Sequence, residues 1–160
     1  MILKTYIIFA LIVLIITRFR KVTTASQAYS KAQTWDTVFR KDKALASMIK
    51  SIDLMKDDKE KSILFKMIGM RYCKMKEYYV AVNYFEQSFE IALPLKFFYS
   101  PGLSEVIQAY LNANQPDRAK ELYDNFLARS SYDRKFNKLK KLEGYFTTEE
   151  HKQHAKTAAD

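Results

Sequence analysis

Residues that interrupt regular secondary structure or form disulfides are scarce in this chain of 160 residues, which contains three glycines, three prolines and one cysteine, Cys73. A single cysteine excludes an internal disulfide. Three scattered glycines cannot form a phosphate-binding loop. Because sheet proteins place glycine and proline at their turns, a chain with so few of them is typical of a helical protein.

Histidine is also scarce, and this argues against catalysis. The two histidines, His151 and His154, form an H-x-x-H pair in a polar tail, without the H-E-x-x-H pattern of zinc proteases or a packed environment to orient the rings. A Ser/His or Cys/His nucleophile is unsupported, and we interpret Cys73 as a packing residue. We therefore expect no enzymatic activity, no metal site and no cofactor.

Acidic residues are in the minority, with 18 against 27 lysines and arginines and a net charge of +9. Apolar residues make up 48% of the chain, which excludes the disordered class. Nearly all of the positive charge follows residue 17. It suits an anionic neighbour such as lipid headgroups, nucleic acid or an acidic protein, although a solvated lysine-rich surface is the simpler interpretation.

One long apolar run lies at the N-terminus, where residues 5–17 carry no charge. Extended to residues 2–19, a helix here would be about 27 Å long, close to the roughly 30 Å of a bilayer core. Lys4 and Arg18 would then reach the two interfaces. We expect a single transmembrane helix at 2–19, and a cleaved signal peptide or a buried soluble helix are the alternatives.

The basic residues around this run predict its orientation. Arg18, Arg20 and Lys21 follow it directly, where a signal peptide needs small neutral residues, and only Lys4 precedes it. Cationic flanks stay on the cytoplasmic side. We therefore expect a single-pass membrane protein, for example of a bacterial plasma membrane, with its N-terminus outside and the rest of the chain in the cytoplasm.

A pattern of apolar and small residues recurs along the rest of the chain and is clearest between residues 62 and 95. It predicts two facing helices, with the polar residues 74–77 as the turn between them. Gly69 and Ala81 are small where the two helices would come closest. The positions of the pattern are Phe65, Ile68, Gly69, Tyr72, Tyr78, Ala81, Phe85 and Pro94.

This pattern resembles the tetratricopeptide repeat (TPR), a helix–turn–helix unit of about 34 residues. The resemblance predicts three units, at 25–58, 62–95 and 100–133. The chain departs from the family at Lys76, which replaces the turn glycine, and at an insertion, 96–99, between the second and third units. Matching positions of the outer units include Ala28, Ala32, Trp35, Ala44 and Met48 in the first and Tyr110, Ala119 and Tyr123 in the third.

The resemblance implies an all-α fold in which antiparallel helix pairs stack as a short right-handed α-solenoid. Residues 134–146 are expected to form a helix that caps the stack, because Phe136, Leu139 and Leu142 make a narrow apolar stripe. The basic residues at 134–141 either stay solvated or rest on anionic lipid. The remaining segment, 147–160, is a polar tail.

In the TPR family, extended peptides or partner helices bind in a concave groove lined mainly by first helices. The resemblance therefore implies a membrane-tethered scaffold or adaptor that binds a partner protein or peptide. The corresponding groove positions are Tyr29, Gln33 and Asp36 in the first unit, Lys66, Met70 and Lys74 in the second, and Ser104, Gln108 and Asn112 in the third. Some members clamp a terminal carboxylate with an Asn where this chain has Met70, so we expect no such clamp.

Two other functions stay open on the sequence. An accessory subunit of a larger membrane complex would need the same anchor and helical stack. A nucleic-acid-binding helical repeat is compatible with the positive charge, but the lysines and arginines are spread over all segments and the aromatic residues fall on packing positions. We therefore expect no nucleic acid as a partner.

Overall fold

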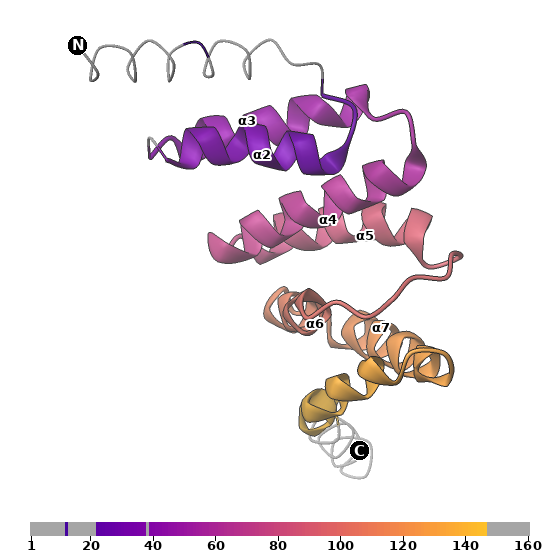
Figure 1. Ribbon diagram of the computed structural model, residues 1–160. Coiled ribbons are helices and arrows are strands. Elements are labelled where there is room, and N and C mark those ends of the chain that lie inside the picture. Colours follow the sequence, from indigo (N-terminus) through magenta and orange to yellow (C-terminus); the bar gives the residue numbers. More distant parts are fainter. Residues whose placement is uncertain (1–11, 13–21, 38, 147–160) are drawn as a thin grey trace, which may run out of the picture. The chain divides into compact units, whose positions relative to one another are not determined.

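The fold is given by a computed structural model, which describes residues 12, 22–37 and 39–146. This part of the chain is all-helical and contains no strand, which confirms the predicted all-α class for these residues (Figure 1). The helices are α2 (Ala25–Asp36), α3 (Lys41–Ser51), η1 (Ile52–Leu54), α4 (Asp58–Lys74), α5 (Tyr78–Ala92), α6 (Gly102–Asn112), α7 (Pro116–Ala128), η2 (Arg129–Ser131) and η3 (Arg134–Leu142), where η marks a 3-10 helix.

No helix within the described residues combines the length and the apolar character that crossing a bilayer requires. The anchor expected at 2–19 lies outside the described residues except for residue 12. Its flanking residues Lys4, Arg18, Arg20 and Lys21 lie outside them as well, as does the tail at 147–160 with both histidines.

The chain divides into two compact units, Met1–Ile68 and Gly69–Asp160, and the boundary lies inside α4. In the first unit, α2 and α3 pack on each other. Ala28 and Ala32 of α2 and Ala44 of α3 are fully buried. Their small side chains, at helical spacing, let the two backbones come close.

The start of α2 is bound by two side-chain acceptors. The hydroxyl of Thr24 accepts from the Gln27 amide at 3.3 Å, and the Glu60 carboxylate accepts from the Ala25 amide at 2.6 Å. The first amides of a helix have no partner within the helix and carry a partial positive charge. Glu60 therefore ties α2 to the first turn of α4.

Three helix–turn–helix connections share one backbone conformation. Each contains a residue in the left-handed region: Phe39, Lys76 and Asn114, with φ of 57°, 62° and 56°. The amide after each of them donates to the carbonyl five residues back, as in the Schellman end of a helix. These bonds join Arg40 to Trp35 (2.9 Å), Glu77 to Tyr72 (3.0 Å) and Gln115 to Tyr110 (2.9 Å). One connection is thus used three times.

The second helix of each pair also starts in the same way. Its first backbone bond is donated by a fully buried alanine, Ala44, Ala81 or Ala119. The bonds are Ala44 to Arg40 (3.0 Å), Ala81 to Glu77 (2.9 Å) and Ala119 to Gln115 (3.0 Å). The described part of the chain is therefore internally repetitive in backbone geometry as well as in sequence pattern.

Gly69 allows α4 and α5 to lie unusually close. A Cβ placed on Gly69 would lie 2.5 Å from Cε1 of Phe85 and 3.0 Å from the carbonyl oxygen of Ala81. Atoms without a bond between them do not pack at such distances, because interiors are already close-packed. The close approach predicted from Gly69 and Ala81 is confirmed.

The TPR-like positions serve packing in this structure. Those that are buried are Phe65, Gly69, Ala81, Phe85, Tyr110, Ala119 and Tyr123. Tyr72 is half-buried and stacks on Tyr84 with ring centres 5.5 Å apart. Pro94 is exposed after the end of α5.

Aromatic rings form the centre of the second unit. Phe85 of α5 lies 6.4 Å from Tyr110 of α6, measured between ring centres. Phe97, in the loop before α6, contacts Phe126 of α7 and Phe136 of η3 edge to face, both at 6.0 Å. Such tilted and edge-on pairs add to the free energy of apolar burial. The core thus joins helices α5, α6, α7 and η3.

A single carboxylate crosslinks three of these helices. Glu86 of α5 accepts two bonds from the Arg118 guanidinium of α7 and one from the Tyr110 hydroxyl of α6, all at 2.8 Å. The hydrogen bond from Arg118 lowers the pKa of Glu86. Burial, followed by the bond to Glu86, raises the pKa of Tyr110, which keeps its proton and stays a donor.

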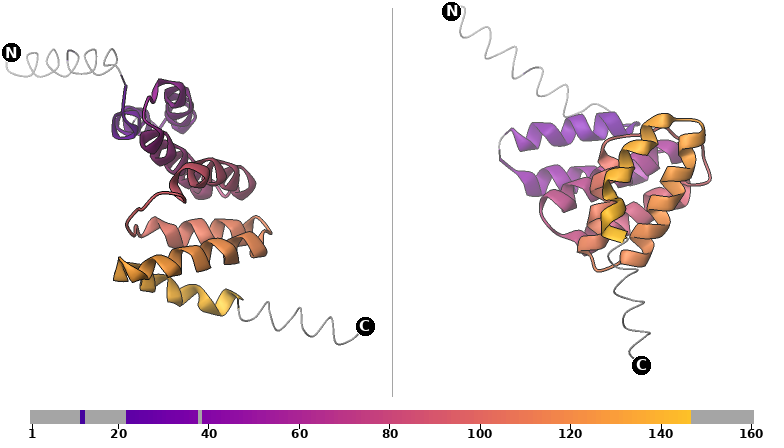
Figure 2. Two further views of the ribbon diagram at one scale, coloured as in Figure 1. Left: turned by 90° about the vertical axis from the view of Figure 1, so that its right-hand side faces the viewer. Right: turned by 90° about the horizontal axis from the view of Figure 1, so that it is seen from below.

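The cap predicted at 134–146 is a helix, and most of it is of the 3-10 type. In η3, Phe136, Leu139 and Leu142 are buried, and the helix packs on α7 and α6 (Figure 2). A 3-10 helix has about 3.0 residues per turn, so residues three apart lie on one side. The strict apolar period of three therefore matches this helix type. Residues 143–146 continue as an α-turn that buries Phe146.

Candidate functional site

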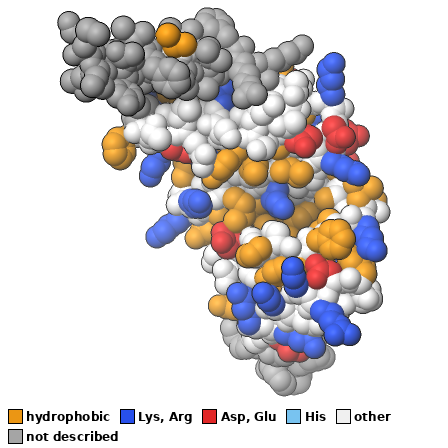
Figure 3. All heavy atoms as spheres, in the orientation of Figure 1, with side chains coloured by type: hydrophobic (Ala, Val, Ile, Leu, Met, Phe, Trp, Pro, Cys, Tyr) orange, Lys and Arg blue, Asp and Glu red, His pale blue; other side chains and the backbone are white. Residues whose placement is uncertain are grey.

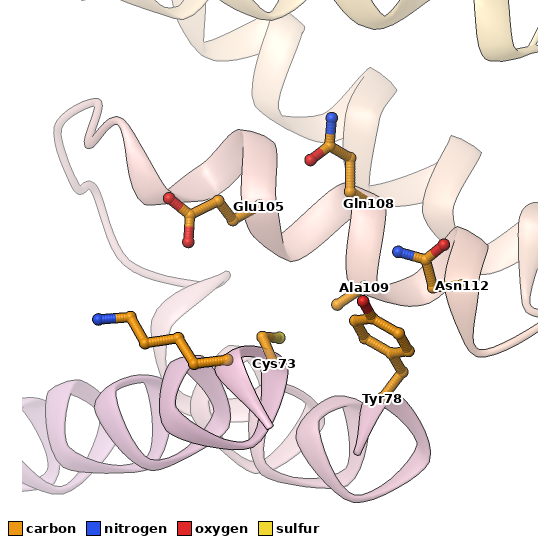
Figure 4. Close-up of a pocket in the computed structure, with 7 residues that line it drawn as sticks. Cys73, Tyr78, Glu105, Gln108, Ala109 and Asn112 are labelled. Carbon is orange, nitrogen blue, oxygen red and sulfur yellow. The ribbon is translucent and has the colours of Figure 1, made fainter. Parts of the chain in front are cut away.

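A pocket in the second unit lies between the end of α4, the first residue of α5 and one face of α6 (Figure 4). Its volume is about 190 Å³. It is lined by Cys73, Lys74, Tyr78, Glu105, Gln108, Ala109 and Asn112. We take this pocket as the candidate functional site.

The α6 wall follows from helical spacing. Glu105, Gln108, Ala109 and Asn112 stand at positions i, i+3, i+4 and i+7, which share one face of a helix. Ala109 is buried and small, whereas the other three are exposed. The wall therefore offers a carboxylate and two carboxamides around an apolar floor.

The opposite wall is placed by the turn between α4 and α5. The left-handed conformation of Lys76 reverses the chain, so Tyr78 comes close to Cys73 and Lys74 at the end of the preceding helix. In Figure 4, Tyr78 extends toward Ala109 and Asn112 of α6. Its ring forms one end of the pocket.

The cysteine in this pocket is not set up as a nucleophile. Burial, and to a lesser degree the nearby Glu105 carboxylate, raises the pKa of the Cys73 thiol to about 11. The thiol therefore stays protonated at neutral pH, and the thiolate is the reactive form of cysteine. The interpretation of Cys73 as a packing residue agrees with this environment.

The chemistry of the pocket suits binding. Carboxamides donate and accept at once, so Gln108 and Asn112 match the amide and carbonyl groups of a polypeptide. Pockets for drug-sized ligands usually measure roughly 300–1,000 Å³, and this one is smaller. It has room for one or two side chains of a bound segment.

The structure brings together three of the nine predicted groove residues. Lys74, Gln108 and Asn112 line the pocket. Met70 instead packs at the start of α6, where a Cβ added to Gly102 would lie 3.4 Å from its Cε. Ser104 is 6% exposed, so its hydroxyl faces the interior and not a surface groove.

The other four predicted groove residues belong to the first unit. Gln33 is exposed on α2, while Tyr29, Asp36 and Lys66 are half-buried. Burial lowers the pKa of Lys66, so its ammonium is less favourably solvated than that of a surface lysine. These residues make no part of the pocket in the second unit.

Four pocket residues were not on the predicted groove list. Glu105 and Ala109 stand three residues before Gln108 and Asn112, so helical spacing alone would have found them. Tyr78 and Cys73 were assigned to packing, because their sequence positions lie on the helix faces that meet. The reversal at Lys76 brings Tyr78 beside Cys73, and the packing of α6 on α5 places both residues at the edge of α6.

Within the residues that the structure describes, no group of three or more His, Cys, Asp or Glu side chains is placed to hold a metal ion.

Compared with protein-family models, with curated proteins and with solved structures, this chain has no match.

Proposed function

We propose that the chain is a membrane-tethered scaffold of TPR-like repeats, and that it binds an extended segment of a partner protein at the pocket of its second unit. The observation that carries the proposal is the meeting of Lys74, Gln108 and Asn112 at that pocket. These three residues are groove positions by the resemblance to the TPR family, and they lie on the first helix of their pairs.

The repeated connection supports the repeat architecture. The turns at Phe39, Lys76 and Asn114 each place one left-handed residue at the same point of the turn and share one pattern of backbone bonds. Identical helix pairs stack into a solenoid, here expected to be short and right-handed, because each pair leaves an apolar face that only a neighbour can cover. Such a stack presents a preformed surface, and a partner can bind it without remodelling the scaffold.

The charges at the pocket set the kind of partner and the affinity. Lys74 and Glu105 lie on opposite walls with the carboxamides of Gln108 and Asn112 beside them, so the surface is polar and nearly balanced. It favours a segment that offers backbone groups and small polar side chains over a strongly charged one. We expect dissociation constants in the micromolar range, since few groups become fully desolvated.

The membrane tether rests on the apolar run at 2–19 and on the basic residues after it. An anchor of this kind holds the binding surface at the bilayer and raises the local concentration of the bound partner. The proposed location is cytoplasmic, with one membrane pass.

Peptide selection tests the binding site. A displayed library of random peptides is selected on the full chain in nanodiscs, and the selected peptides are measured by fluorescence anisotropy. Asn112→Ala and Gln108→Ala should each weaken binding about fivefold, because each removes hydrogen bonding worth roughly 1 kcal/mol.

Asn83→Ala is the matched control, because Asn83 is also an exposed carboxamide but lies on the second helix of its pair. It should leave the affinity unchanged. Peptides that bind wild type and the two pocket variants equally well would place the site elsewhere, and a selection that yields no binding peptide would contradict the proposal.

A further inference from the structure

The loop of residues 93–99, which contains the predicted insertion, is held in place by Arg129, the first residue of η2. Arg129 donates to the carbonyl oxygens of Leu93 (2.6 Å) and Leu95 (2.9 Å). Its guanidinium also lies 4.1 Å from the centre of the Phe97 ring. A loop restrained in this way loses little conformational freedom on binding. The side chains that it exposes are therefore preorganised.

Two further contacts join this loop to η3. The Tyr132 hydroxyl donates to the carbonyl oxygen of Phe97 at 2.9 Å. The Asp133 carboxylate accepts from the amides of Tyr99 (2.9 Å) and Lys135 (3.1 Å), and these bonds lower its pKa. One carboxylate thus fixes the loop against the first turn of η3.

The restrained loop leaves aromatic rings in water. Phe98 is 70% exposed, and its ring meets Tyr132 edge to face at 6.4 Å. The Lys96 ammonium lies 4.8 Å from the centre of the Tyr132 ring. Tyr132 also touches the buried Phe136 edge to face at 6.2 Å, whereas no ring contact joins Phe98 to the described core. An exposed aromatic ring beside a cation is typical of surfaces that meet the lipid headgroup region.

The 3-10 geometry of η3 aligns its lysines next to these rings. Lys135, Lys138 and Lys141 are exposed and follow each other at intervals of three, so they form one straight row with about 6 Å between members. In an α-helix the same three residues would be spread over about 120° of the surface. Lys138 lies 5.9 Å from the centre of the Tyr99 ring, which places the row beside the loop.

We propose that Lys96, Phe98, Tyr132, Lys135, Lys138 and Lys141, here called the basic–aromatic ridge, contact the anionic headgroups of a phospholipid bilayer. The row of lysines supplies charge complementary to the headgroups. The Phe98–Tyr132 pair supplies the apolar surface that enters the interface. In Figure 3, several Lys and Arg side chains lie close together on the lower part of the face shown, next to hydrophobic side chains and with a few Asp or Glu side chains between them.

The ring geometry favours lipid over nucleic acid. Bases bind by stacking on an open ring face. Here the Phe98 and Tyr132 rings stand at 88° to each other, and Lys96 covers a face of Tyr132, so the pair offers an apolar edge more than a stacking platform. The apolar run at 2–19 is expected to hold the same chain at a bilayer. The ridge would then lie near lipid headgroups, and it shares no residue with the peptide pocket.

The test measures contact between the basic–aromatic ridge and the bilayer in proteoliposomes that contain the full chain. A fluorescent probe is attached to a cysteine introduced by Asn137→Cys, with Cys73→Ala to remove the native thiol, because Asn137 is exposed between the lysines of η3. The vesicles contain phosphatidylcholine alone or with about one third phosphatidylserine, and they carry a headgroup nitroxide quencher. Flotation with neutral vesicles reports separately on the anchor.

We expect quenching in the anionic vesicles only, and its reversal at high salt, where the screening length falls to a few ångströms. Each cation at such a surface strengthens contact about fivefold, which is about 1 kcal/mol. The triple variant Lys135→Gln, Lys138→Gln, Lys141→Gln should therefore shift the docked-to-free ratio by roughly 100-fold. Phe98→Ser should reduce it by about tenfold.

The matched control is Lys41→Gln, Lys50→Gln, Lys56→Gln, which removes the same charge from exposed lysines of the first unit and should keep the quenching. Circular dichroism verifies that each variant is folded. Equal quenching in neutral vesicles, or equal loss in the control, would overturn the proposal. So would single-stranded RNA binding that depends on the three ridge lysines while vesicle contact is absent.

Discussion

At the scale of single residues, Gly69 shows how one missing methyl group sets the distance between two helices. The atoms that a Cβ would meet belong to the Phe85 ring and to the backbone of Ala81. The ring lies in a packed core and the carbonyl is part of a helix, so neither can yield without shifting α5. Gly69 is thus required by close approach and not by its backbone angles.

Gly69→Ala should destabilise the second unit by about 1–2 kcal/mol, because overpacking costs roughly 1–3 kcal/mol and the better helix propensity of alanine returns part of it. Urea unfolding of the full chain measures the change. Gly144→Ala is the control, since a Cβ there meets no atom within 4 Å, and it should be neutral or slightly stabilising. Equal effects at both sites would show that α4 and α5 do not nest at Gly69.

At the scale of elements, the three turns impose one conformation on three different residues. Phe39, Lys76 and Asn114 all have positive φ, although only Gly, and to a lesser degree Asn and Asp, adopt it readily. The Schellman bonds and the packing of the flanking helices impose the conformation against the preference of Phe and Lys. Lys76 therefore stands where the TPR-like pattern has glycine because the pair can tolerate the strain.

Lys76→Gly should stabilise the protein by about 0.5–1 kcal/mol. The substitution removes a left-handed cost of roughly 1–2 kcal/mol, while glycine loses more backbone entropy on folding. Thermal unfolding should give a higher midpoint for Lys76→Gly and no gain for Lys76→Ala, which keeps a Cβ at the same φ. A gain of equal size in the alanine variant would assign the effect to the lysine side chain instead.

At the scale of the whole molecule, acid should weaken the fold partly through Glu86. Its pKa is lowered in the folded state by Arg118, so it contributes stability above its unfolded pKa of about 4.3. That contribution is lost as the pH falls through the lower, folded value. Glu86 and Arg118 remain partly solvated, so we expect it to be about 1 kcal/mol.

Glu86→Gln should therefore lower the free energy of unfolding by about 1 kcal/mol at pH 7, with the difference disappearing toward pH 3. Urea unfolding of wild type and variant at the two pH values measures it. Glu90→Gln, at an exposed carboxylate of the same helix, should leave both values unchanged. A Glu86→Gln difference of the same size at pH 3 would mean that the carboxylate charge is not what stabilises the three helices.

The candidate site was predictable in part. Three residues that line the pocket, Lys74, Gln108 and Asn112, were predicted as groove positions from the resemblance to the TPR family, which assigns them to first helices. Ser104 was predicted as a groove position in the same way. It does not line the pocket, because the first turn of α6 points its side chain inward. Helical spacing gives the face of α6, but the facing wall depends on how the preceding turn is folded.

The sequence by itself determined the helical class of the described residues, the turn at 74–77, the close contact at Gly69 and the buried stripe of Phe136, Leu139 and Leu142. These follow from local spacing and side-chain size, which act over a few turns of helix. Tertiary structure alone decided the hydrogen bonds of Glu86 to Tyr110 and Arg118, the hydrogen bonds from Arg129 to the loop at 93–99, and the position of the lysine row beside that loop. Those depend on partners more than 20 residues apart, whose meeting is set by the packing of whole helices.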